Sequence, residues 1–86
     1  MDTTHRLNAG QQHIHDAAFT AARDAAAGSD LSAHERLTLA SAAGWRAARI
    51  AQTDAAGQGA GYAHDLIRGA IAEGFVAGSQ AQREAA

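Results

Sequence analysis

The sequence predicts an all-α protein, a three-helix bundle dominated by an antiparallel helical hairpin with an alanine- and glycine-rich seam. Three observations support this prediction. Twenty-five of the 86 residues are alanine, the residue with the highest helix propensity, proline is absent, and glycines divide the chain into three stretches. The net charge of −2 is too small to favour disorder, so we expect one ordered helical domain over residues 1–86.

The first helix is expected from about residue 4 to residue 27. Its apolar side is a narrow stripe of Leu7, Ile14 and several alanines. Gly28 follows this stretch, and a glycine in the left-handed conformation commonly ends a helix. A stripe of this kind indicates a helix that lies against a neighbour.

The second helix is expected over about residues 32–54. Ser32 and Glu35 fit a capping box, in which each side chain bonds the backbone N–H of the other residue. Apolar residues, among them Leu37, Leu39 and Ile50, cover about half of the circumference. Because so wide a face can contact two neighbours, we expect this helix at the centre of the bundle.

The third helix is expected over about residues 62–82. Alanines recur along it at seven-residue intervals, at Ala63, Ala70 and Ala77, which allows close approach of another backbone. The second helix offers a matching strip of small residues: Ala40, Gly44, Ala47 and Ala51. We therefore expect these two helices to form the dominant antiparallel hairpin.

Trp45, the only tryptophan, falls near the middle of the polar face of the second helix. Two interpretations stay open. The first helix or a second copy of the chain covers this face, or Trp45 is an exposed contact for a protein partner, since Trp and Arg dominate binding energies. On the second interpretation the partner-binding residues are Trp45, Arg46, Arg49 and Gln52.

A glycine-rich turn suggests an alternative site. Gly57, Gly59 and Gly61 precede the third helix, where free backbone N–H groups favour an anion, and Tyr62 or Arg68 of a neighbouring subunit would complete the pocket. The turn follows a helix and lacks the lysine of a phosphate-binding loop. The alternative function is an oligomeric small-ligand or nucleotide-binding protein that uses its subunit interfaces.

No motif predicts catalysis, a metal or a cofactor. His13 and His15 are two apart and cannot face one ion from a helix, whereas His13 and Asp16 can, and two ligands make a weak site. No nucleophile has an activating neighbour, so we expect no catalytic residue and no enzyme. His64 lies at the edge of the apolar face of the third helix, where it bonds a neighbouring helix or makes an interface sensitive to pH.

Charge and hydropathy exclude further classes. Nine acidic residues and seven arginines are interspersed, which argues against nucleic acid, and no apolar run is long enough for a membrane span. The first residues lack the pattern of a signal peptide, so we expect a cytoplasmic protein. Leu, Ile, Val and Phe number only twelve, and so small a core favours a homo-oligomer.

These observations together predict a small non-enzymatic protein–protein interaction module. Such a chain acts as an adaptor or an inhibitor by surface contact on a larger partner, as do the inhibitors that phages and plasmids direct against host defence systems. No residue in the sequence identifies that partner.

Overall fold

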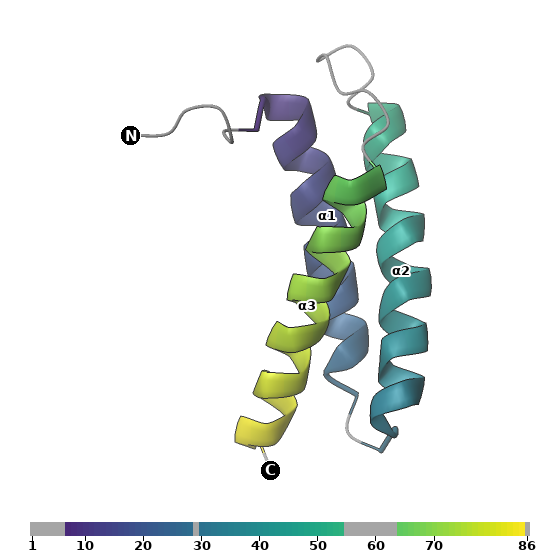
Figure 1. Cartoon of the computed structure of the whole chain (residues 1–86), viewed down its shortest axis with the longest axis vertical. Coiled ribbons are helices and arrows are strands. Elements are labelled where there is room, and N and C mark those ends of the chain that lie inside the picture. The colour runs from purple at the N-terminus through teal and green to yellow at the C-terminus, as the bar shows by residue number, and fades with distance from the viewer. Residues whose placement is uncertain (1–6, 29, 55–63, 86) are drawn as a thin grey trace.

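A computed structural model describes residues 7–28, 30–54 and 64–85. These residues form three helices, α1 (Ala9–Ala26), α2 (Ala33–Asp54) and α3 (His64–Ala85), and include no strand. Successive helices run in opposite directions, and α3 crosses in front of α1 (Figure 1). The predicted all-α three-helix bundle is confirmed.

The first helix begins later than predicted because Asn8 caps it. The Gln11 N–H donates to Asn8 Oδ1 at 2.8 Å, and the Asn8 N–H donates to Gln11 Oε1 at 3.0 Å. This capping box fixes the start of α1 at Ala9 instead of near residue 4. The helix ends at Ala26, as expected to within a residue, but Gly28 does not take the left-handed conformation predicted for it.

The second helix has the predicted bounds to within one residue. The Ser32 N–H donates to Glu35 Oε1 at 2.9 Å and the Glu35 N–H donates to Ser32 Oγ at 3.2 Å, so the predicted capping box is confirmed. The third helix continues to Ala85, three residues beyond the prediction. Its expected start at residue 62 lies outside the described residues.

The central helix is α1, and the prediction that α2 is central is wrong. α1 packs extensively against both neighbours, while α2 and α3 contact each other much less. The physical reason is a row of small residues along α1, since Ala18, Ala22 and Ala26 are completely buried and let a helix approach from either side. The most extensive antiparallel hairpin is therefore α1–α2, and the predicted α2–α3 pair is a minor contact.

Glycines bring α3 against the backbone of α1. A Cβ atom added to Gly74 would lie 2.5 Å from the carbonyl oxygen of Phe19, and one added to Gly78 would overlap the carbonyl oxygen of Arg23. The small-residue seam therefore exists, but on α3 its glycines face α1. Gly44 of α2 is also close-packed, because a Cβ there would meet Ile71 of α3.

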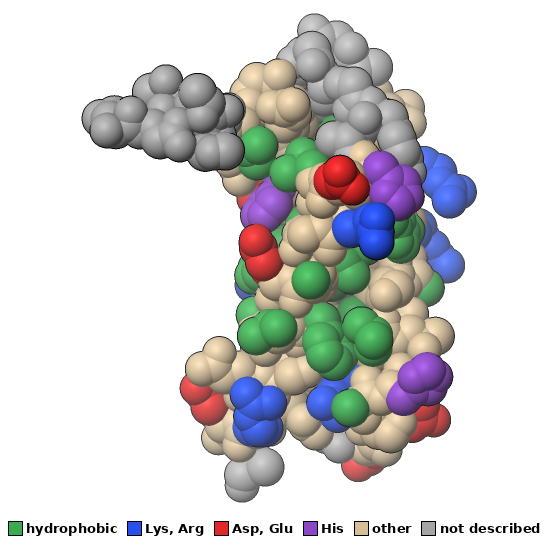
Figure 2. All heavy atoms as spheres, viewed as in Figure 1, with side chains coloured by type: hydrophobic (Ala, Val, Ile, Leu, Met, Phe, Trp, Pro, Cys, Tyr) green, Lys and Arg blue, Asp and Glu red, His purple; other side chains and the backbone are tan. Residues whose placement is uncertain are grey.

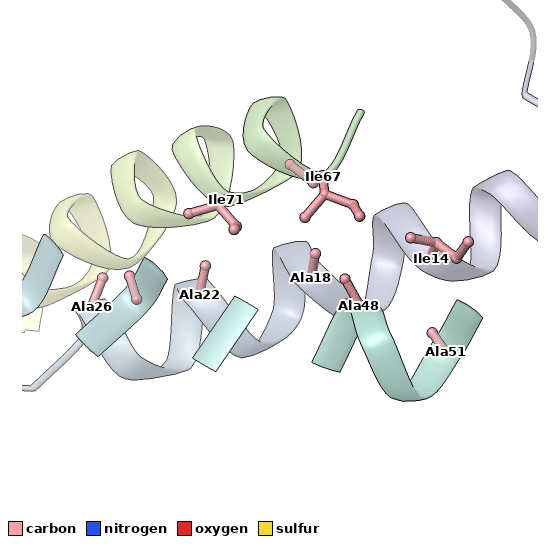
Figure 3. Close-up of a cluster of buried hydrophobic side chains, with 10 residues drawn as sticks. Ile14, Ala18, Ala22, Ala26, Ala48, Ala51, Ile67 and Ile71 are labelled. Carbon is pink, nitrogen blue, oxygen red and sulfur yellow. The ribbon is translucent and has the colours of Figure 1, made fainter. Parts of the chain in front are cut away.

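Little large apolar surface is fully buried in this core. Ile67 and Ile71 point from α3 toward Ala18 and Ala22 of α1 (Figure 3). Ile14 and Ile67 are the largest side chains with full burial in the described part of the chain. Four other large apolar side chains are instead exposed: Leu37, Leu39, Ile50 and Val76. A core so rich in alanine stabilises a monomer weakly.

Candidate protein-binding groove

A groove runs between α2 and α3, because both helices lean on α1 and contact each other little. In Figure 1 the two helices lie close together at the start of α3 and separate toward its C-terminal end. The groove comprises two hollows, of about 290 Å³ and about 70 Å³, with Trp45 common to both. We call this surface the Trp45 groove. Its lining is Leu37, Ser41, Trp45, Ala48, Arg49 and Gln52 of α2, with His64, Ile67, Arg68, Ile71 and Ala72 of α3.

The Trp45 side chain is half-buried and packs against the edge of the hydrophobic core. Its indole ring meets the imidazole of His64, with ring centroids 4.8 Å apart and planes tilted by 46°. The indole thus lies between the helices instead of on the outer polar face of α2. Neither sequence interpretation is complete, since α3 supports the ring on one side and the groove leaves part of it open.

Three of the four predicted partner-binding residues come together here. Arg49 and Gln52 line the smaller hollow beside Trp45. Arg46 is exposed and lines neither hollow. The helical wheel grouped these four side chains on one polar face, and the structure divides them because α3 covers one edge of that face.

The alternative site is only partly described. Gly57, Gly59, Gly61 and Tyr62 lie outside the described residues. Arg68 is exposed and lines the larger hollow together with Trp45. One arginine of the alternative site and the tryptophan of the preferred site therefore share a single groove.

Sequence reasoning missed the apolar part of the groove. Leu37 was placed on the apolar face of the second helix, yet it is 44% exposed and lines the larger hollow beside the buried Ile71. The signal was present, since Leu37, Ser41 and Trp45 follow one another at four-residue intervals and so share one side of a helix. What the spacing did not reveal was that α3 leaves this side open.

Outside the Trp45 groove, a cluster of polar side chains joins α1 to α3. His15 Nδ1 lies 3.1 Å from Asp16 Oδ1, and His15 Nε2 lies 3.3 Å from Glu73 Oε1. The hydrogen bond from His15, followed by that from the Gln12 amide, holds the pKa of the Asp16 carboxyl below its ordinary value. Asp16 therefore pairs with His15 in the structure, whereas the sequence suggested His13. Within residues 7–28, 30–54 and 64–85, no three His, Asp or Glu side chains are grouped to hold a metal ion.

Comparisons with protein-family models, with curated proteins and with solved structures found no match to this chain. None of the described helices is both long enough and apolar enough to cross a lipid bilayer.

Proposed function

We propose that this chain is a non-enzymatic protein–protein interaction module, an adaptor or inhibitor that contacts a larger partner through the Trp45 groove. The observation that carries the proposal is a half-buried tryptophan in an open groove with an exposed leucine beside it. Contact residues with large binding energies are commonly aromatic side chains held in packed pockets, because the rigid ring buries much surface at small entropic cost.

The groove has the anatomy of a contact surface. Leu37 and Ile71 supply an apolar lining, and the exposed Arg49 and Arg68 supply a polar rim. Hydrophobic side chains gather over the middle of α3 and along its boundary with α2 (Figure 2). A partner that covers this area would remove apolar surface from water and complete the burial of Trp45.

Two leucines give a matched test of the proposal. Leu37 is 44% exposed and lines the groove, whereas Leu39 is 47% exposed and lines a different hollow beside Leu31 and His34. Wild type, Leu37→Glu and Leu39→Glu would each be used to capture partners from the native cells, with quantitative mass spectrometry and reconstitution from purified components. We expect a protein that wild type and Leu39→Glu retain and Leu37→Glu loses. Equal retention by all three, or no partner for any, would contradict the proposal.

A small-ligand function is the second candidate, and one observation favours it. The larger hollow brings Trp45, His64 and Arg68 together around about 290 Å³, which is close to the size of small-molecule pockets. Native mass spectrometry of the purified protein distinguishes the two candidates. A bound small molecule that Leu37→Glu loses, without any protein partner, would favour the ligand over the partner.

Self-association remains part of the proposal. Ile50 and Val76 are each 60% exposed and lie outside the Trp45 groove, and the core holds few large buried side chains. A small domain with so little core is commonly stabilised by oligomerisation, which favours a second copy. Light scattering over a range of concentrations should give a mass above that of one chain, and a monomer at every concentration would contradict this expectation.

A further inference from the structure

We infer that the Trp45 groove takes an acidic amphipathic helix of the partner protein, with carboxylates on both sides of its apolar stripe. This inference rests on the proposed function and names the chemistry of the partner. Two independent features of the groove support it, the row of side chains along α2 and the charge of the rim.

The shape of the groove fits a helix. Its α2 wall is a row running from Leu37 through Ser41 and Trp45 to Gln52, which spans about 22 Å at the helical rise of 1.5 Å per residue. The two hollows lie in series along this row, one on either side of Trp45. A helix bound in a groove places apolar side chains at positions i, i+3 or i+4, and i+7, so consecutive turns of a partner would reach the two hollows.

The charge of the rim selects the partner. The ionisable side chains that line the groove among the described residues are Arg49 on α2 and His64 and Arg68 on α3, and no carboxylate lines it. Asp65 Oδ1 is 3.9 Å from Arg68 Nη1, but both side chains are exposed, and a pair of this kind is weak in water. A chain of net charge −2 thus presents a groove with an arginine on each wall.

The positive charge on both walls of the groove favours acidic residues on both sides of the apolar stripe of the partner helix. Arg49 and Arg68 project from opposite walls, so a helix between them meets a cation on each side. Carboxylates at those flanks would pair with the arginines, speed association and fix the register of the helix, whereas basic flanks would be repelled.

The test is a selection from displayed helices. A library of single-helix peptides of about 18 residues keeps an apolar stripe fixed and randomises the flanking positions. It is selected on the whole protein and counter-selected on Leu37→Glu. We expect Asp and Glu to be enriched on both flanks, and binding of the selected peptides to weaken as NaCl rises.

Charge reversal tests the two arginines directly. Arg49→Glu and Arg68→Glu should each weaken binding of a selected acidic peptide about three- to tenfold. Arg83→Glu is the matched control, because Arg83 is exposed near the end of α3 and does not line the groove. It should bind the same peptide as wild type does.

The outcomes separate this inference from the proposed function. Selected peptides that require Leu37 but carry neutral or basic flanks would contradict an acidic partner. They would remain consistent with a protein–protein interaction module. The absence of any binder that requires Leu37 would overturn both. Dissociation of a self-associated protein by Leu37→Glu would show that a second copy occupies the groove, and this would also overturn the inference.

Discussion

The rings of Trp45 and His64 face each other across the boundary of α2 and α3, with centroids 4.8 Å apart. This contact joins two helices that otherwise touch little, since each packs mainly on α1. Trp45 lines both hollows of the groove, and His64 lines the larger one. The tryptophan is therefore both a packing residue and part of the surface offered to a partner.

Removal of the imidazole should expose the indole. His64→Ala should lower the free energy of unfolding by about 0.5–1 kcal/mol, as expected for a contact between rings, and increase the acrylamide quenching of Trp45. His34→Ala is the control, because His34 is exposed on α2 and does not line the groove. Equal quenching in wild type and His64→Ala would show that the ring contact does not shield the indole.

Alanine in place of a close-packed glycine tests the contact between α1 and α3. Gly74→Ala should lower the free energy of unfolding by about 1–3 kcal/mol, because the new Cβ would press on the backbone of Phe19. Gly69→Ala is the matched control on the same helix, since nothing lies within 4 Å of a Cβ there. It should raise stability by up to about 1 kcal/mol through helix propensity. Thermal unfolding of both variants measures the contrast, and similar shifts would contradict the proposed seam.

Replacement of the buried Ser79 hydroxyl should stabilise the protein. Ser79 is 6% exposed and its Oγ has no hydrogen-bond partner among the described residues. Ser79→Ala removes this unsatisfied group and improves helix propensity, so it should raise the free energy of unfolding by about 1 kcal/mol. Urea unfolding tests the change against Ser41→Ala, a half-buried serine in the groove. A loss of stability in Ser79→Ala would mean that the hydroxyl is bonded in solution.

Stability should fall in acid through two carboxyl groups. The hydrogen bond from His15 lowers the pKa of Asp16 below 3.8, and the Ser32 backbone N–H, with the Ser32 hydroxyl, lowers that of Glu35 below 4.5. A group whose pKa is lowered by folding stabilises the protein above its unfolded pKa, and this contribution disappears as the pH falls through the folded pKa. Both groups therefore support the fold at neutral pH; Glu35 loses that effect as the pH falls below about 4.5, and Asp16 loses it below about 3.8.

Neutral variants check this acid dependence. Asp16→Asn and Glu35→Gln should each flatten the fall of the unfolding free energy with decreasing pH. The effect of Asp16 should be below about 1 kcal/mol, because its side chain is well exposed and screened by water. Asp30→Asn, at an exposed residue outside the three helices, serves as the control. If both variants lost stability in acid as steeply as wild type does, Asp16 and Glu35 would not be the groups responsible.

Local signals in the sequence predicted much of this fold. The capping box of Ser32 and Glu35 and the helical propensity of alanine depend on neighbouring residues alone, and the bundle follows from them. These local signals did not show which helix lies at the centre of the bundle. Small residues occur on all three helices, and periodicity shows which positions allow close approach without showing which helix approaches.

The candidate site was only partly predictable for the same reason. The wheel of α2 identified Trp45 and Arg49, but it treated the apolar face as buried, and so Leu37 was missed. Whether an apolar residue is covered depends on where the third helix lies. That position is set by the contact of Gly74 with α1, which no feature of α2 reveals.

Acrylamide quenching of Trp45 reports whether the groove is open, because the chain has one tryptophan and it lies in the groove. We expect partial quenching of Trp45 in the dilute free protein. We expect Trp45 to be protected from acrylamide when the groove is saturated with a selected peptide whose binding requires Leu37. Leu39→Glu should behave as wild type does. A tryptophan fully protected in the dilute free protein, or equally quenched with and without the bound helix, would contradict an open groove that binds a partner.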